Sequence, residues 1–116
     1  MDLKKLQEKV IQFRDERDWK QFHNPKDLAL SINIEAGELA ELFQWKTNEE
    51  IREVLKDPKK LQELKYELAD VMIYCLDLAE ETGIDLEKAI LEKLEQNSKK
   101  YPVEKSKGSA KKYTEL

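Results

Sequence analysis

The stretch LADVMIYCLDLA, residues 68–79, decides the fold, because a helix drawn through it is apolar around almost its whole circumference. Such a pattern is typical of a helix surrounded by neighbouring helices, and it indicates an all-α protein built around this segment. Asp70 interrupts the apolar run, and Glu67 precedes Asp70 by three residues. Side chains three positions apart share one helix face. The central helix therefore turns two carboxylates toward what should be the protein interior.

A second helix, which contains NIEAGELAELFQW at residues 33–45, departs from its pattern in the same way. Its apolar stripe is formed by Leu28, Ile32, Leu39 and Phe43. Glu35 lies in the middle of this stripe, and Glu38 lies at its edge one turn further along. Glu41 turns further toward solvent. Two helices therefore each place a carboxylate pair where a core is expected.

Capping signals divide the chain into five helices, expected at about residues 3–17, 25–45, 47–56, 58–81 and 85–100. Asn24-Pro25 and Asp57-Pro58 each join an N-cap to a first-turn proline, and Gly83 ends the helix before it. The expected fold class is all-α: a compact helical bundle with four main helices and one short extra helix over residues 1–101. An irregular basic C-terminal tail, residues 102–116, follows in the same domain.

The composition agrees with a helical protein and excludes several other classes. The 116 residues are 40% charged and 40% hydrophobic, with three Gly and three Pro, which suits a single helical domain. A net charge of −4 argues against a nucleic acid polymer or an anionic membrane as partner. No apolar run is long enough to cross a bilayer, and the N-terminus lacks a secretory pattern, so we expect a cytoplasmic protein.

Buried carboxylates are costly unless something compensates them. Lys or Arg partners are one remedy, and a hard divalent cation is the other. Carboxylate oxygens suit Mg²⁺, with Mn²⁺ as a possible substitute, whereas zinc or copper would need several His and Cys ligands, and this chain has only one of each. The three-residue spacing alone is weak evidence in a chain with 25 acidic residues. From the residues alone, a magnesium site and salt-bridged carboxylates at the edge of the core both stay open.

Polar and aromatic residues elsewhere also admit two interpretations. Lys93 and Asn97 lie one turn apart on the inner stripe of the last long helix, although Lys93 could extend along that stripe to water. Trp residues such as Trp19 and Trp45 are more often core or interface residues than ligand stackers. His23, the single histidine, immediately precedes a helix cap, where a structural role is the simpler interpretation.

The segments EAGELAELFQW (residues 35–45) and ELADVMIY (residues 67–74) resemble the MazG-like all-α nucleoside triphosphate pyrophosphohydrolases, which carry ExxE and ExxD metal motifs on two helices. Within that superfamily, the chain is most similar to the dCTP pyrophosphatase branch. The distinctive segments are ERDWKQFHNPKDLALSINIEAGELAELFQW (residues 16–45) and KLEQNSKKYPVEKSKGSAKKYTEL (residues 93–116). The resemblance covers nearly the whole chain.

This resemblance implies an activity and a set of site residues. Members of the family hydrolyse a nucleotide between its α and β phosphates and release a monophosphate and pyrophosphate. The metal ligands that carry over are Glu35, Glu38, Glu67 and Asp70. The residues that carry over for the base and sugar pocket are Trp19, Trp45, Tyr74, Lys93, Asn97 and Tyr101. Ile34 stands where the family often has a further glutamate (EExxE), so this chain lacks that carboxylate.

The expected reaction combines the two lines of reasoning. Mg²⁺ held by the four carboxylates bridges the triphosphate oxygens, and water attacks the α-phosphorus. Glu38 is the candidate general base and Glu41 is the alternative. Candidate substrate contacts also include His23, and Lys112 of the tail, which would neutralise phosphate oxygens. The tail could equally be solvated, or fold over the phosphates as a flap of a neighbouring subunit.

The expected partners are a nucleotide, dCTP or a modified dCTP, and further copies of the chain in a homodimer or homotetramer. Two alternatives stay open. The same fold could act on dUTP or phosphoribosyl-ATP, or the chain could be a non-catalytic helical oligomerisation or adaptor protein. A di-iron bundle is set aside because it needs Glu-x-x-His motifs that this sequence does not contain.

Overall fold

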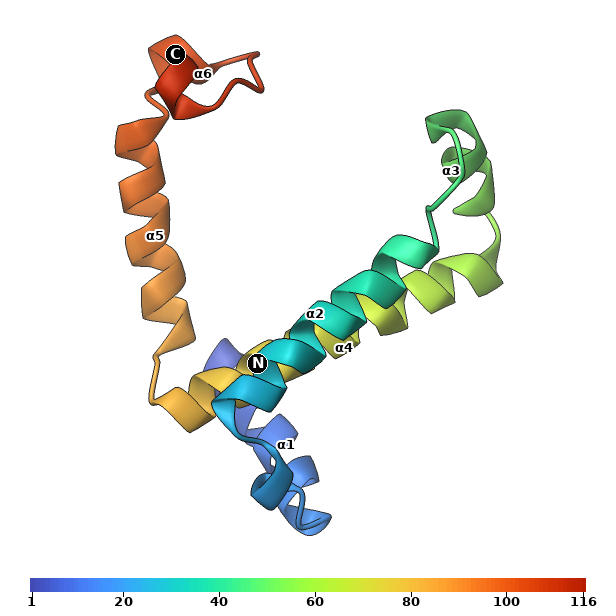
Figure 1. The fold of residues 1–116 in the computed structure, drawn as a ribbon, viewed down its shortest axis with the longest axis vertical. Coiled ribbons are helices and arrows are strands. Elements are labelled where there is room, and N and C mark those ends of the chain that lie inside the picture. The colour runs from blue at the N-terminus through green and yellow to red at the C-terminus, as the bar shows by residue number, and fades with distance from the viewer. The chain divides into compact units, whose positions relative to one another are not determined.

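The computed structural model describes all 116 residues and contains helices, turns and no strand (Figure 1). It divides into two units, Met1–Gly83 and Ile84–Leu116, which are described separately. The predicted fold class is confirmed, because four long helices and one short helix carry most of the chain. None of these helices is both long enough and apolar enough to span a membrane.

The first unit contains α1, α2, α3 and α4, and a 3₁₀ turn, η1, precedes α2. Their bounds are α1 Leu3–Glu16, η1 Lys20–Phe22, α2 Pro25–Glu41, α3 Asn48–Val54 and α4 Pro58–Thr82. The second unit contains α5 Leu86–Lys100, α6 Val103–Ser106 and a second 3₁₀ turn, η2 Tyr113–Glu115. The residues expected to form an irregular tail therefore include two short helical turns.

The helices begin where the capping signals predicted. The Asn24 carboxamide oxygen accepts a hydrogen bond from the Asp27 amide at 2.9 Å, and the Asp57 carboxylate accepts one from the Lys59 amide at 3.0 Å. Each side chain satisfies an amide in the first turn, and a proline at the next position needs no partner. These local contacts explain why the sequence alone located the helix starts.

The predicted end of α2 at residue 45 was wrong, because the helix ends at Glu41. Residues 42–45 form turns, and Trp45 takes a left-handed backbone conformation with φ of +68°. Thr47, which follows this turn, is extended and caps α3, because its side chain accepts a hydrogen bond from the Glu50 amide. The Trp45 side chain is 92% exposed.

In the first unit, α4 packs against α2 along much of its length and against α1 near its C-terminal half (Figure 1). The core consists of Leu28 from α2 together with Leu76 and Ala79 from α4. Gln7 of α1 donates a hydrogen bond to the Leu76 carbonyl oxygen at 3.2 Å, which ties α1 to this core.

Gly83 and Gly37 should respond in opposite ways to replacement by alanine. Gly83 ends α4 with φ of +68°, and a Cβ there meets no atom within 4 Å, so Gly83→Ala should cost about 1–2 kcal/mol through backbone strain alone. Gly37 lies inside α2, and a Cβ there also meets no atom within 4 Å. Because alanine favours the helix more than glycine does, Gly37→Ala should stabilise the protein by about 1 kcal/mol. Urea denaturation measures both, and shifts of the same sign would contradict the backbone argument.

Candidate functional site

A cluster of acidic side chains lies between α2 and α4. Glu35 and Glu38 of α2 and Glu67 of α4 each offer a carboxylate oxygen, and these three oxygens lie within 4.8 Å of one another. Each helix contributes residues spaced three apart, and the two helices pack side by side (Figure 1), so the paired carboxylates meet. Three of the four carboxylates predicted to converge are therefore grouped in the structure, and Asp70 is not one of them.

Within the first unit, no basic side chain forms an ion pair with this cluster. The ion pairs in the structure involve other acidic residues, and none includes Glu35, Glu38, Glu67 or Asp70. One oxygen of Glu35 and one of Glu67 are buried without any hydrogen-bond partner. Buried oxygens of this kind need a donor or a cation. The chemistry of the donor set therefore fits a hard divalent cation such as Mg²⁺, and the salt-bridged alternative has no support in the geometry.

Burial and mutual repulsion favour the protonated forms of Glu35 and Glu67. Burial raises the pKa of Glu35 to about 6, assisted by the adjacent Glu38 carboxyl and by the charges of Asp70 and Glu67. The pKa of Glu67 is also raised, first by burial and then by the charge of Glu38. A group of carboxylates that resists ionisation in the absence of a cation is the expected state of an acidic metal site.

Asp70 and Glu41 lie at different places relative to this cluster. The charge of Asp70 raises the pKa of both Glu35 and Glu67, so Asp70 lies near them, although it is not one of the three tightly grouped carboxylates. Glu41 is exposed at the end of α2, and its charge has the smallest effect on the pKa of Glu67. Of the two candidate bases, Glu38 is therefore the one within the cluster.

Without divalent cations, the free energy of unfolding should fall as the pH rises through about 6. The pKa of Glu35 is about 6 in the folded protein and 4.5 when unperturbed, so the folded state holds this proton more tightly. The contribution of Glu35 to the free energy of unfolding is complete below its pKa in the unfolded chain, and it is lost above its pKa in the folded protein. Thermal melting in EDTA between about pH 5 and 7.5 measures the trend.

The Glu35→Gln variant should show a flatter profile, whereas Glu49→Gln, which changes an exposed glutamate, should follow the wild type. An equal pH slope in the wild type and the Glu35→Gln variant would contradict this assignment.

A cavity of about 400 Å³ lies beside the acidic cluster, within the first unit. Three of the residues predicted to bind substrate line it, namely Trp19, His23 and Tyr74. The ring centroids of Trp19 and His23 are 6.4 Å apart, and those of His23 and Tyr74 are 6.3 Å apart. Asp70 also lines this cavity, so it is common to the aromatic cavity and the acidic site.

The other residues predicted to bind substrate are Trp45 in the first unit and four residues in the second unit. Trp45 does not line it and lies beyond the end of α2. Lys93, Asn97, Tyr101 and Lys112 belong to the second unit, where their role in the site stays a prediction. Within that unit the tail folds back, because Tyr113 packs edge-on against Tyr101 with centroids 5.9 Å apart.

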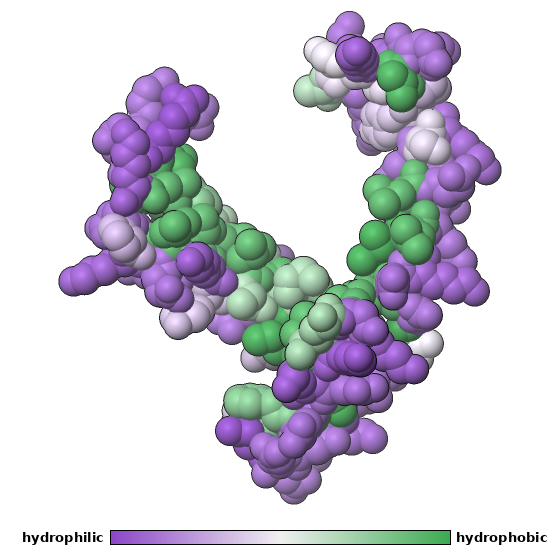
Figure 2. Space-filling model, turned by 180° about the vertical axis from the view of Figure 1, so that it is seen from behind, coloured by the Kyte–Doolittle hydropathy of each residue, from purple (hydrophilic) through white to green (hydrophobic).

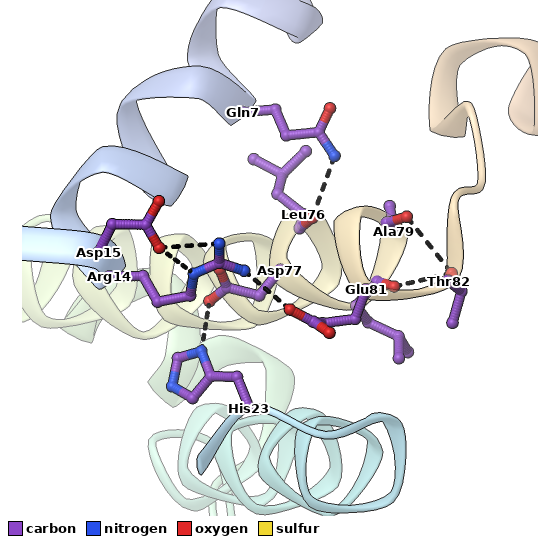
Figure 3. Close-up of polar contacts among 10 residues, drawn as sticks. Gln7, Arg14, Asp15, His23, Leu76, Asp77, Ala79, Glu81 and Thr82 are labelled. Atoms are coloured by element: carbon purple, nitrogen blue, oxygen red, sulfur yellow. Dashed lines mark hydrogen bonds and ion pairs between the residues drawn. The ribbon is translucent and has the colours of Figure 1, made fainter. Parts of the chain in front are cut away.

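Sequence reasoning gave no role to two buried charged residues, Arg14 and Asp77, which are 3% and 2% exposed. Arg14 of α1 bonds the carboxylates of Asp15 at 2.8 Å and Glu81 at 2.9 Å. Asp77 of α4 lies with one oxygen 3.7 Å from His23 Nδ1 (Figure 3). The signal for Asp77 was visible, since it is the second acidic residue inside the apolar run of residues 68–79.

The chain is similar in sequence to a known protein family and to named proteins, and similar in structure to a solved pyrophosphatase. The family described as MazG-like matches residues 30–116. Proteins named dCTP pyrophosphatase 1 from Rattus norvegicus and Homo sapiens are 48% and 46% identical over 105 residues, which is 90% of this chain. The chain spans 62% of the length of these curated relatives. A pyrophosphatase from Archaeoglobus fulgidus has 42% identity and a TM-score of 0.79, covering 86% of this chain and 92% of that one.

Proposed function

The chain belongs to the MazG-like family, and we propose that it is a nucleoside triphosphate pyrophosphohydrolase that converts dCTP, or a 5-modified dCTP, to the monophosphate and pyrophosphate. The observation that carries this proposal is the position of Asp70, which is near the unpaired carboxylates on one side and lines the aromatic cavity on the other. A nucleotide needs two such adjoining regions, one for its phosphates with their cation and one for its base.

Glu35, Glu38, Glu67 and Asp70 would hold Mg²⁺, or Mn²⁺ in its place. When bound, the cation supplies positive charge that offsets the developing charge on the phosphate oxygens. Without it, the acidic cluster would repel a triphosphate, since no basic residue of the first unit pairs with these carboxylates. The family resemblance and the unpartnered oxygens of Glu35 and Glu67 both support this ligand set.

The proposed reaction is attack of water on the α-phosphorus. The water oxygen bonds to this phosphorus, the bond to the oxygen that bridges the α and β phosphates breaks, and pyrophosphate leaves with that bridging oxygen. Glu38, which is within the acidic cluster but exposed, would accept the proton of the attacking water. Glu41 is the alternative base, one turn closer to the end of α2.

The base would lie against Trp19, His23 and Tyr74, whose rings line the cavity. Trp45 would complete the base pocket of a second copy, which explains why a large aromatic side chain is 92% exposed. Lys93, Asn97 and Tyr101 would contact the sugar and phosphates, and the tail at residues 102–116, with Lys112, would cover the phosphates as a flap. These assignments rest on the family resemblance.

Self-association as a homodimer or homotetramer is part of the proposal. Hydrophobic side chains form exposed bands along α5 and along the α2–α4 pair (Figure 2). The exposed large hydrophobic side chains include Tyr66, Leu68 and Met72 of α4 in the first unit and Leu91 and Leu94 of α5 in the second unit. Exposed apolar surface on this scale is typical of an interface between protein chains.

A cytoplasmic location stays a prediction from the sequence.

The test is hydrolysis of a nucleotide panel with Mg²⁺ in water labelled with ¹⁸O. The panel contains dCTP, 5-methyl-dCTP, dUTP and phosphoribosyl-ATP, and the readout separates pyrophosphate from orthophosphate. We expect pyrophosphate from the cytosine nucleotides, with the label in the monophosphate. Label in the pyrophosphate would overturn attack at the α-phosphorus, and release of orthophosphate would overturn the bond assignment. Failure to hydrolyse any member of the panel would overturn the activity.

A further inference from the structure

We propose that Asp77, which lines the aromatic cavity beside His23, selects the base by accepting a hydrogen bond from the exocyclic amino group of cytosine. This inference rests on the proposed function and deepens it, since it assigns the discrimination between an amino and a keto group to one side chain. Neither the ExxE and ExxD motifs nor the predicted pocket residues include Asp77.

Asp77 is a buried residue of the cavity wall, and one of its carboxylate oxygens has no hydrogen-bond partner. Its side chain is 2% exposed and lines the cavity, yet its Oδ1 atom has no hydrogen-bond partner. Its Oδ2 atom is 3.7 Å from His23 Nδ1, which is longer than a hydrogen bond, and Nδ1 also has no partner. Unsatisfied buried carboxylate oxygens are expensive, so a bound donor would recover energy at this position.

The ion pairs of this region leave Oδ1 of Asp77 without a partner, because His23 Nδ1 faces Oδ2 at 3.7 Å. Arg14 is the buried cation nearby, and its guanidinium bonds Asp15 and Glu81 but not Asp77 (Figure 3). Two carboxylates therefore already neutralise Arg14. Burial raises the pKa of Asp77 even though the charges of His23 and Arg14 oppose this shift. One oxygen of the buried carboxyl group, Oδ1, is thus left without a hydrogen-bond donor from the protein.

The chemistry of the cavity indicates which base this group would recognise. Cytosine presents an amino donor where uracil and thymine present a carbonyl acceptor. A carboxylate oxygen accepts from the amino group, but facing a carbonyl it would remain unpaired and would repel it. Trp19, His23 and Tyr74 provide ring faces that hold any base, so selectivity has to come from a polar group such as Asp77.

The experiment compares equilibrium binding of the α,β-imido analogues of dCTP and dUTP, which cannot be cleaved between the α and β phosphates, by calorimetry with Mg²⁺. Wild type should bind the dCTP analogue at least about tenfold more tightly, because the dUTP analogue leaves Asp77 unpaired. Asp77→Asn should reduce that ratio by about tenfold or more, because the amide can rotate and donate to the uracil carbonyl. An unchanged ratio would overturn the proposal.

Glu81→Gln is the matched control. Glu81 bonds the same Arg14 and lies one turn beyond Asp77 on α4, but it does not line the cavity. This variant should keep the wild-type preference between the two analogues. If Glu81→Gln changes the ratio as much as Asp77→Asn does, the effect acts through Arg14 and the proposed contact is wrong. A purely structural role of Asp77 would weaken both analogues equally and leave the ratio unchanged, which also overturns the proposal.

A second measurement on the wild type avoids any folding defect of Asp77→Asn. The imido analogue with a 2-pyrimidinone base carries hydrogen in place of the amino group, and it should bind at least about tenfold more weakly than the dCTP analogue. Equal affinity would overturn the inference. The binding experiment and the hydrolysis experiment test different proposals. Selective binding without release of pyrophosphate would overturn only the proposed hydrolysis. Hydrolysis without selective binding sinks only the role of Asp77, and binding of neither analogue overturns both.

Discussion

Glu67→Gln should lower kcat/KM for the preferred nucleotide by about 10²–10³-fold, because it removes a charge that positions the cation and the phosphates. Glu67 is the α4 member of the acidic cluster, and one of its oxygens is buried without a partner. The variant should also lose the increase in melting temperature that Mg²⁺ gives the wild type. Steady-state kinetics and thermal melting, each with and without Mg²⁺, measure the two effects.

Glu63→Gln is the control for this experiment. Glu63 lies one turn earlier on α4, is half-exposed and pairs with Lys60 at 3.5 Å, outside the cluster. Its replacement should leave both kcat/KM and the response to Mg²⁺ close to wild type, because an exposed ion pair contributes little. If Mg²⁺ raises the melting temperature of Glu67→Gln as much as that of the wild type, the metal site is not where we place it.

Leu76→Ala should reduce the free energy of unfolding by about 2–5 kcal/mol. Leu76 of α4 is 2% exposed at the level where α1 joins the packing, and its truncation leaves a cavity that the helices cannot easily close. Because a small domain is marginally stable, this single change should remove a large share of its stability. Urea denaturation at a fixed protein concentration measures the loss, since self-association would add to the apparent stability.

The matched variant is Leu61→Ala, which makes the same truncation on the same helix at a side chain that is 38% exposed. Its loss should be about 1 kcal/mol, because much of the removed surface was already in contact with water. Equal losses for the two variants would show that Leu76 is not at the centre of the packing.

Much of the local structure was predictable because its causes lie within a few residues. N-cap side chains, prolines in the first turn and Gly83 after α4 act on neighbouring backbone groups, so the helix starts and the end of α4 follow from the sequence. The acidic motifs were predictable for the same reason. Residues three apart share a helix face, so Glu35 with Glu38 and Glu67 with Asp70 were each expected on one face, and Glu35, Glu38 and Glu67 are grouped in the structure.

The end of α2 was harder to predict, because the apolar period continues through Phe43 although the helix has ended. Residues 42–45 form turns, and Thr47, which follows them, is extended and caps α3. A helix period cannot reveal such a turn. Trp45 is an exposed residue with a left-handed backbone, and its predicted place in the base pocket stays a prediction.

The sequence by itself determined the helices and which residues share a face, since hydrogen bonding and side-chain spacing along a helix are local. Only the tertiary structure decided which faces meet. It showed that no basic side chain of the first unit pairs with the acidic cluster and that Arg14 is already neutralised by Asp15 and Glu81. It also showed that Asp77 faces His23 with one oxygen and leaves the other without a hydrogen-bond partner. The physical reason is that the environment of a buried charge depends on groups brought from distant segments, which no pattern within one helix contains.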